Sequence, residues 1–510
     1  MPLTNKSFMQ SFSRIGMFFD MMPFDNLHDI PGAENAYLVG GCVRDRLIGL
    51  RPQDFDIAAP PPVRDFAEHI ARRIGGHCVE LGKPGRQVIR IVSGRPQVDV
   101  APINGPSIES DLAKRDFTIN ALARRLSSGE IIDCTGGIRD LEQKIIRMVS
   151  DQSFIADPLR LLRTYRLAAI LNFRIDTATS AAVARHADKI RNVAGERIRL
   201  ELFKLLEVEN ACLRLEQMSR ERLLFAVIPE LEPLVGCLQN RHHAFDAWIH
   251  TLKVVEEMEA ILNRPPRLLS AADSPALSAC LKGGIPVLLK ISALLHDIGK
   301  PATRKIIHTK GPVFYGHHET GAEMAEAVSA RLRFSVHETR IVTQIIRHHL
   351  GPLRLWIQAE KGALSRKAVT RFFMRCETLT PLILLHALAD HRGKRPRGTL
   401  PEDDFSRFIL NLLTAYFTEY QERKNRRPLL TGHDLISEFD LKPGPDFKFI
   451  LNRVEAARLS GEAVTRENGL EIVSELLKTC IGDRQPGIDT PSGRTKTGLP
   501  HKKRGGDRPG

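Results

Sequence analysis

The chain lacks clustered cysteines, long apolar runs and an abundance of aromatic residues. Its eight cysteines are scattered without a C-x-x-C pair, which argues against the disulfide framework of a small secreted protein and favours a reducing cytoplasm. No apolar run approaches the roughly 18 to 20 residues that a membrane span needs. Aromatic residues make up 6% of the chain, without a cluster of the kind that stacks single-stranded bases. These absences predict a cytoplasmic protein with no membrane partner.

Length and charge indicate several domains and a polyanionic partner. With 510 residues, 42% of them hydrophobic and 26% charged, the chain is expected to fold into about two to four domains. Its formal net charge of +14 is typical of proteins that bind nucleic acid, although an anionic lipid surface would select the same composition. Part of the excess lies after Asp483, in a stretch rich in Gly, Pro, Lys and Arg that predicts a disordered tail.

The apolar pattern changes along the chain from mixed to helical. Up to about Arg147, β-type runs such as Tyr37–Val39 alternate with helical stretches such as Val63–Ile74. From Asp157 to about Leu477 the segments are almost all of helical type, separated by Pro, Gly and Asn. The predicted fold class is therefore α+β, with a small mixed-sheet head followed by a mostly α-helical remainder.

A glycine turn followed by two strand carboxylates forms the first chemical motif. An apolar strand ends at Gly40-Gly41, where glycines let main-chain N–H groups approach a phosphate. In the next strand a period of two places Asp54 and Asp56 on one face. Because adjacent like charges repel unless a cation lies between them, the pair predicts a Mg²⁺ site for phosphoryl or nucleotidyl transfer rather than a solvated edge strand. Asp99 either completes this site or pairs with Arg90.

Five motifs in one order resemble the class II tRNA nucleotidyltransferases and bacterial poly(A) polymerases. They are the glycine turn with its carboxylates, DLAKRDFTINA (111–121), IIDCTGGIRDLEQKIIR (131–147), ADPLRLLRTYRLA (156–168) and ERIRLELFKLL (196–206). Each motif alone is a weak signal, but together they are specific. The resemblance implies an enzyme that adds C and/or A residues to the 3′ end of tRNA, using CTP and ATP and no nucleic-acid template.

The fourth motif places a candidate base-reading pair at the start of a helix. Arg160, Arg163 and Arg166 share one helix face, which by itself would be an ordinary charged surface. Cytosine and adenine both present an amino donor beside a ring-nitrogen acceptor, whereas uracil and guanine present the reverse order. Asp157, as an acceptor, and Arg160, as a donor, would accept C or A and reject U or G. The family resemblance implies the same assignment.

The resemblance also assigns residues around the triphosphate. It implies that Gly40-Gly41 and Arg44 contact the triphosphate and that Arg115 contacts the nucleotide. Arg163 and Arg166 would help to hold base and phosphate. Without the resemblance, these arginines would be interpreted as surface charges.

Two departures from the family pattern leave the substrate range open. Ala156 stands where the family has a glutamate that would orient the arginine. Only Pro102–Ser110 separates the Asp99 strand from Asp111, where many CCA-adding members carry a longer flexible loop, and the short form is seen in relatives that add only the two cytidines. A CC-adding specialist is therefore an alternative. A poly(A) polymerase is another, disfavoured because Leu81–Arg90 lacks the basic-aromatic strand of those enzymes.

A second site is indicated in the helical remainder. LLHDIGK (294–300) resembles the signature of the HD phosphohydrolases, in which an adjacent His and Asp bind a metal with a His from an earlier helix and an Asp from a later one. The ligands in this order are His250, His296, Asp297 and Asp390. His317 and the His348-His349 pair offer ligands for a second metal. The resemblance implies a divalent transition metal and hydrolysis of 2′,3′-cyclic or terminal phosphates, while a relic used only for tRNA docking stays open.

These motifs divide the chain and define two alternatives of a different class. The predicted parts are an N-terminal extension (1–33), a nucleotidyltransferase head (34–147), a helical neck (148–238), an HD-type domain (239–360), a helical C-terminal region (361–482) and a disordered basic tail (483–510). The alternatives are an HD phosphohydrolase with a degenerate head, and a non-catalytic RNA-binding protein. The number of nucleotides added and the oligomeric state are left open.

Overall fold

The structure is a computed structural model that describes residues 27–82, 87–93, 97–239, 244–263, 273–309, 311–394 and 404–480. It forms two compact units, one made of residues 1–364 with 375–418 and the other of residues 365–374 with 419–510. Most of the predicted N-terminal extension and all of the predicted basic tail lie outside the described residues. The last part of the extension belongs to the fold, since Leu27 and Ala33 are fully buried.

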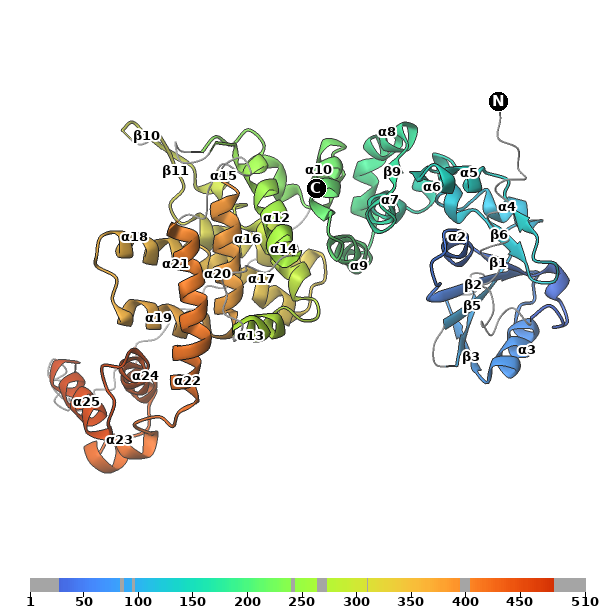
Figure 1. Cartoon of the computed structure of the whole chain (residues 1–510). Helices are drawn as coiled ribbons and strands as arrows, with labels where there is room; N and C mark the ends of the chain where they lie inside the picture. Colours follow the sequence, from blue (N-terminus) through green and yellow to red (C-terminus); the bar gives the residue numbers. More distant parts are fainter. Residues whose placement is uncertain are drawn as a thin grey trace, which may run out of the picture. The chain divides into compact units, whose positions relative to one another are not determined.

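A seven-stranded mixed sheet forms the head (Figure 1). Its strands are β1 (Tyr37–Val39), β2 (Asp54–Ala59), β3 (His77–Leu81), β4 (Val88–Val92), β5 (Gln97–Pro102), β6 (Ala123–Arg125) and β7 (Ile131–Ile132), in the order β3-β4-β5-β2-β1-β6-β7. Within the described part of this sheet, β2 and β5 are the only neighbours that pair in parallel. Phe55 and Ile57 of β2 are buried, so Asp54 and Asp56 lie together on the opposite face, as the period of two predicts.

Short helices surround the sheet and lead into the neck. They are α2 (Gly41–Leu47), α3 (Arg64–Ile74), α4 (Ile108–Leu112) and α5 (Gly137–Glu142) around the head, then α6 (Gln152–Ala156), α7 (Leu159–Ile170), α8 (Thr177–His186), α9 (Gly195–Leu206), α10 (Ala211–Arg220) and α11 (Leu223–Val227). Strands β8 (Ile145–Ile146) and β9 (Arg174–Ile175) pair in parallel beside α7. Helix α7 buries Leu161, Tyr165 and Ala168 completely, which turns its arginine face outward from the core.

The rest of the first unit, the helical body, packs around a buried helix, α14 (Ile285–Leu295). Its elements are α12 (Ala247–Asn263), α13 (Asp273–Cys280), α14, α15 (Lys300–Thr303), α16 (His317–Arg331), α17 (Val336–His348), α18 (Gly351–Glu360), the end of α19 (Arg366–Cys376), α20 (Thr380–Arg392) and α21 (Asp404–Ala415). A hairpin of β10 (Lys305–Ile307) and β11 (Gly311–Val313) interrupts the helices. The sequence pattern does not predict it, because strands of three residues are too short for a period of two to be recognised.

The turn between α14 and α15 packs too closely on α16 to accept a side chain. A Cβ on Gly299 would lie 2.2 Å from the main-chain oxygen of His317 and 2.6 Å from the main-chain nitrogen of Gly321. We expect Gly299→Ala to lower the free energy of unfolding by about 1–3 kcal/mol, because main-chain atoms must move to make room. Denaturant unfolding of the purified protein measures the change. Gly284→Ala is the matched control, because nothing lies within 4 Å of the added Cβ; an equal loss in both variants would contradict the packing argument.

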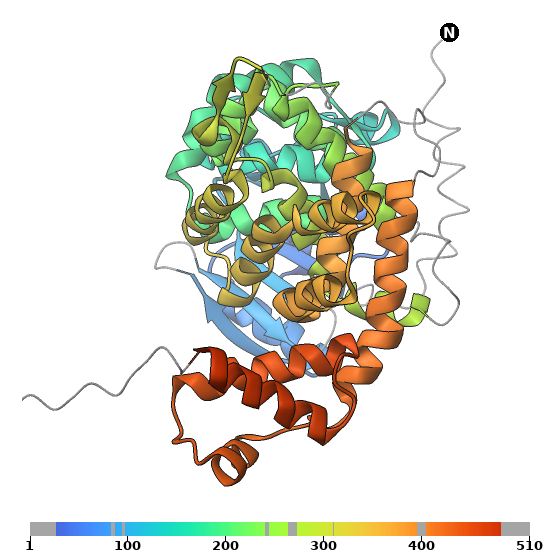
Figure 2. The ribbon, with the colours of Figure 1, turned by 90° about the vertical axis from the view of Figure 1, so that its left-hand side faces the viewer.

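The second unit is a small helical domain with its own core (Figure 2). It contains α22 (Gln421–Asn425), α23 (Gly432–Phe439), α24 (Pro445–Ser460) and α25 (Arg466–Cys480). Its buried core residues are Leu430, Leu435, Ile450, Val454 and Val473.

Within the described residues, one helical stretch, Arg366–Arg392, is long and apolar enough to cross a membrane, but 72% of its most apolar window is buried inside the fold. Such burial is typical of a core helix.

Candidate active site and metal centre

The N-terminal motifs converge on one cleft of about 590 Å³ in the first unit. Its lining includes nine of the residues singled out in the sequence: Gly40, Gly41, Arg44, Asp54, Asp56, Arg115, Arg160, Arg163 and Arg166. The residues come from β2, from α2 and the turn before it, from the segment after α4 and from α7. The cleft therefore combines two strand carboxylates with five guanidinium groups, a charge distribution that suits a metal-bound polyphosphate.

A glycine-specific backbone conformation opens the cleft beside the carboxylates. Gly40 has φ 76° and ψ −135°, a region that residues with a Cβ rarely adopt. A Cβ at this position would also lie 3.0 Å from a terminal guanidinium nitrogen of Arg115 and 3.8 Å from Oδ2 of Asp56. Gly40 therefore leaves space between an arginine and a carboxylate at the entrance of α2.

The carboxylates of β2 have the environment of a cation site. Within the described residues, Asp54 and Asp56 form no hydrogen bond or ion pair with a side chain, whereas Asp99, opposite Asp56 in the parallel pair β2–β5, is held by Arg90 at 2.8 and 2.9 Å. Desolvation in the cleft raises the pKa of the Asp56 carboxyl; the charge of Arg115 offsets part of the rise, and the charges of Asp99 and Asp54 add to it. A divalent cation would relieve this repulsion, so Asp54 and Asp56 fit a metal. Of the two readings of Asp99, the pairing with Arg90 is the one observed.

Two buried groups that sequence reasoning did not single out hold the arginines of the cleft. Asp116 pairs with Arg163 at 3.0 Å, and Asn120 accepts a hydrogen bond of 2.7 Å from Arg44. Burial alone would raise the pKa of Asp116, but Arg163 and hydrogen bonds from Asn120 and the main chain outweigh it and lower the pKa. Both residues lie in the motif 111–121. The carboxylate directly after Arg115 was the feature of the sequence that could have pointed to Asp116. Arg166 is held by Glu201 of α9 at 3.0 Å.

The proposed base-reading pair is held by separate partners. Asp157 is not among the residues lining the cleft; both of its carboxylate oxygens lie near Arg197, at 3.1 and 3.3 Å. Arg160 lines the cleft and donates from one terminal nitrogen to the main-chain oxygens of Lys114, at 3.0 Å, and Ser153, at 3.3 Å. The structure therefore brings Arg160 into the cleft and leaves Asp157 at its side.

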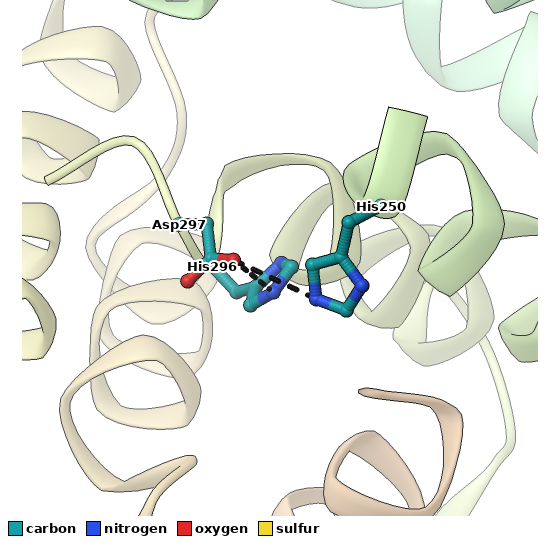
Figure 3. Close-up of side chains that lie close together, drawn as sticks. All are labelled: His250, His296 and Asp297. Carbon is teal, nitrogen blue, oxygen red and sulfur yellow. Dashed lines mark ion pairs between the residues drawn. The ribbon is translucent and has the colours of Figure 1, made fainter. Parts of the chain in front are cut away.

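The metal-ligand motif of the helical body forms a buried cluster (Figure 3). His250 comes from α12, and His296 and Asp297 follow directly after α14. Oδ2 of Asp297 lies 3.0 Å from Nε2 of His296 and 3.6 Å from Nε2 of His250, which is also 3.1 Å from Oδ1 of Asp390. Donor atoms of His250, His296 and Asp297 all lie within 4.8 Å of one another. The fold therefore brings together the residues that the resemblance to HD phosphohydrolases implies as ligands.

The tautomers of the clustered histidines suit a metal. Nδ1 of His250, His296, His317 and His349 each faces a main-chain oxygen, at 3.2, 2.9, 2.8 and 2.6 Å. Because a carbonyl only accepts, each Nδ1 carries the proton and each Nε2 offers its lone pair to the cluster. Burial lowers the pKa of His250, His317 and His349, which favours the neutral, ligating form, whereas the adjacent Asp297 carboxylate outweighs burial at His296 and raises its pKa.

A second group of ligands adjoins the first. Asp297, His317 and His349 have donor atoms within 4.8 Å of one another, so the carboxylate of Asp297 is shared by both groups. His348, the other member of the predicted pair, belongs to neither group. The cluster opens into a cavity of about 280 Å³ that is also lined by Lys300 and Lys394. This arrangement suits a phosphate ester held by metals and by cationic side chains.

Comparison with known proteins identifies the chain. The poly A polymerase head domain matches residues 36–107 and 95–147, the probable RNA and SrmB-binding site of polymerase A matches 172–235, and the HD domain matches 248–396. The CC-adding tRNA nucleotidyltransferase of Thermus thermophilus is 32% identical over 440 residues, which cover 85% of this chain and 92% of that protein. The chain belongs to the tRNA nucleotidyltransferase family. The A-adding tRNA nucleotidyltransferase of Deinococcus radiodurans is 31% identical, covering 87% of this tRNA nucleotidyltransferase and 96% of that relative.

Solved structures confirm the fold class of this tRNA nucleotidyltransferase. A CCA-adding enzyme in complex with ATP covers 94% of the chain with a TM-score of 0.65 at 20% identity. The Thermotoga maritima CCA-adding enzyme complexed with tRNA covers 91% with a TM-score of 0.61 at 21% identity. The predicted α+β class, a mixed-sheet head followed by a mostly helical chain, is therefore confirmed. Enzymes of this family generally use a divalent metal. The predicted domain boundaries stay predictions.

Proposed function

We propose that this tRNA nucleotidyltransferase is a CC-adding enzyme, which extends tRNA at its 3′ end by cytidines taken from CTP. The observation that supports this most directly is the short, well-anchored connection between β5 and α4. Addition of C and/or A is the broader function of the family, and among the curated relatives the enzymes from Thermus thermophilus, Geobacter sulfurreducens and Synechocystis are CC-adding.

The connection is anchored at several points. The main-chain nitrogen of Asn104 donates to Oδ2 of Asp111 at 2.9 Å, and Lys114 donates to the main-chain oxygen of Asn104 at 2.8 Å. Ser107 and Ser110 form a capping box at the start of α4. Oδ1 of Asp111 in turn accepts from Nε of Arg115 in the cleft, at 3.0 Å. A change from C to A requires the base-reading groups to reorient, and a segment held at each end in this way offers little freedom for that movement.

In the proposed reaction, the 3′-hydroxyl of tRNA attacks the α-phosphorus of CTP, and pyrophosphate leaves. Asp54 and Asp56 would hold Mg²⁺, which supplies charge neutralisation at the phosphates and a lowered pKa for the attacking hydroxyl. Arg44 and Arg115, beside Gly40-Gly41, would bind the triphosphate. Arg160 would donate to the ring nitrogen of the base and Asp157 would accept from its amino group, with Arg163 and Arg166 holding base and phosphate.

Product length tests the proposal. Purified enzyme is incubated with tRNA that ends at the discriminator base, or at CC, and with CTP and ATP separately and together; the products are then sequenced. A CC-adding enzyme extends the first substrate by two cytidines and leaves the CC-ended tRNA unchanged with ATP. Addition of A to the CC-ended tRNA would contradict the CC-adding proposal, and long A tails would indicate a poly(A) polymerase.

A second activity is proposed for the helical body because its imidazoles are held in the ligating tautomer. The enzyme would hydrolyse 2′,3′-cyclic or terminal phosphates at tRNA ends, with a divalent transition metal bound by His250, His296, Asp297 and Asp390. His317 and His349 would bind a second ion. Both activities act on tRNA, which is consistent with a cytoplasmic enzyme and with the basic composition of the chain.

A further inference from the structure

We propose that Arg197 of α9 is a positioning residue for base selection, holding Asp157 in the place from which it accepts the amino group of the incoming base. The proposal rests on the assignment of Asp157 and Arg160 to base reading under the proposed function. A related question is how Arg160 is oriented, since Ala156 supplies no carboxylate for it.

Arg197 contacts both carboxylate oxygens of Asp157. One terminal guanidinium nitrogen lies 3.1 Å from Oδ2 and 3.3 Å from Oδ1, and Oδ1 also accepts from the main-chain nitrogen of Leu159 at 3.3 Å. The carboxylate is thus fixed from α9 and from the first turn of α7. Two carboxylate oxygens have about four lone-pair sites, so acceptor capacity remains for an amino group.

Arg160 is oriented without a carboxylate of its own. The main-chain oxygens of Lys114 and Ser153 accept from the same terminal nitrogen, so the guanidinium is tied to the head and to α6. Its Nε is shielded from solvent and has no hydrogen-bond partner in the described part of the chain. The other donors of its planar fork therefore remain available to a ligand. Main-chain oxygens perform for Arg160 the role that Ala156 cannot.

An isolated surface ion pair would be a weak positioning device, but α9 is held on both sides. Two residues four positions apart on one face of α9 pair with the region of α7. Arg197 pairs with Asp157, just before α7, and Glu201 pairs with Arg166 of α7. On another side of α9, Arg199 pairs with Glu338 and lies 4.4 Å from the Phe203 ring centre.

The beginning of α9 also packs closely against the end of α16. A Cβ on Gly195 would lie 2.1 Å from the main-chain oxygen of Arg331, at the end of α16. Arg331 in turn pairs with Glu230 at 2.7 Å. The guanidinium of Arg197 is therefore carried by a helix whose position the helical body fixes, and this distinguishes it from an ion pair between two mobile surface side chains.

Loss of Arg197 is expected to affect base choice more than the chemical step. Without it, the carboxylate of Asp157 retains only the bond from Leu159, and its side chain can rotate away from the base. The cost falls on CTP, which needs an acceptor for its amino group, and less on UTP, which presents no amino group there. KM for CTP should rise while kcat with CTP changes little.

The test compares five proteins with tRNA that ends at the discriminator base: the full-length wild type, Arg197→Ala, Arg197→Lys, Arg160→Ala and, as the control, Lys204→Ala at an exposed position of α9. The ratio of kcat/KM for CTP to that for UTP is measured for each, and thermal melting checks the fold. We expect Arg197→Ala to lower this ratio about tenfold, as for loss of a charge-assisted hydrogen bond. Arg197→Lys should restore part of it, and Lys204→Ala, on the same helix, should leave it unchanged.

The outcomes separate the two hypotheses. If the wild type prefers CTP and Arg197→Ala keeps that preference, the positioning role is wrong. An equal loss in Lys204→Ala would also overturn it, because the effect would then come from α9 as a whole. If Arg160→Ala does not relax selectivity against UTP, or the wild type does not prefer CTP, the assignment of base reading itself fails.

Discussion

Nucleotide incorporation is expected to fall by at least about a thousandfold when Asp54 or Asp56 is replaced by Asn, since several kcal/mol of charge stabilisation at the phosphates depends on the bound metal. The structural reason is that these carboxylates form no ion pair within the described residues, while their neighbour Asp99 is already held by Arg90. Asn has nearly the same shape but not the charge. Single-turnover incorporation of CTP into tRNA ending at the discriminator base measures the loss.

A matched control comes from the same sheet. Glu80 of the edge strand β3 is half-exposed and pairs with Arg64, away from the cleft. Glu80→Gln should therefore keep wild-type incorporation, and all three variants should bind tRNA with the affinity and salt dependence of the wild type. Incorporation that survives both Asp54→Asn and Asp56→Asn would show that the carboxylates of β2 do not hold the catalytic metal.

The second large effect is expected in the helical body. Asp297 contributes one oxygen to each of the two ligand groups, so Asp297→Asn should remove the bound transition metal and lower phosphohydrolase activity by at least about a hundredfold. Metal content per chain is measured by mass spectrometry, and hydrolysis is followed on a 2′,3′-cyclic nucleotide. Incorporation of CTP by the head cleft should be unchanged, because that cleft shares no residue with the cluster.

The adjacent histidines provide the control for this variant. His349 is buried and belongs to a ligand group, whereas His348 does not. His349→Ala should lower metal content, and His348→Ala should leave both metal content and hydrolysis unchanged. Metal retained at the wild-type level in Asp297→Asn would contradict the assignment of the shared ligand. Normal metal content without any hydrolysis in the wild type would instead support a site kept only for its structure or for tRNA docking.

Local sequence was informative wherever a few neighbouring residues define both geometry and chemistry. The period of two in β2 places Asp54 and Asp56 on one face, and steps of three in α7 place its arginines together. His250, His296, Asp297 and Asp390 were implied as ligands by the resemblance to HD phosphohydrolases, and the fold brings them close together, while their role as ligands stays a prediction. Short elements were harder, and the β10–β11 hairpin was missed.

Contacts between residues distant in the chain could not be predicted from local sequence patterns. Nothing in its own motif distinguishes Asp116 from any other aspartate. Its role appears only in the fold, where it is buried against Arg163. Arg197 lies in a helix whose sequence pattern is that of an ordinary amphipathic surface helix. Its contact with Asp157 joins residues 40 positions apart. No periodicity links such positions, since their proximity depends on how α7 and α9 pack.

The sequence by itself determined the class of this protein: an α+β tRNA nucleotidyltransferase with two carboxylates at a glycine turn, an arginine face on a helix, and a His and Asp metal motif. Residue spacing within one strand or helix specifies the carboxylate pair and the arginine face, whereas the family and the metal motif were inferred from the resemblance of several motifs in their order along the chain. Only the tertiary structure decided which charges remain available for ligands and which are already neutralised. On this basis Asp54 and Asp56 differ from Asp99, which is paired with Arg90, and Asp157 is paired with Arg197. The reason is that the pairing of charges depends on distances between elements rather than on their order.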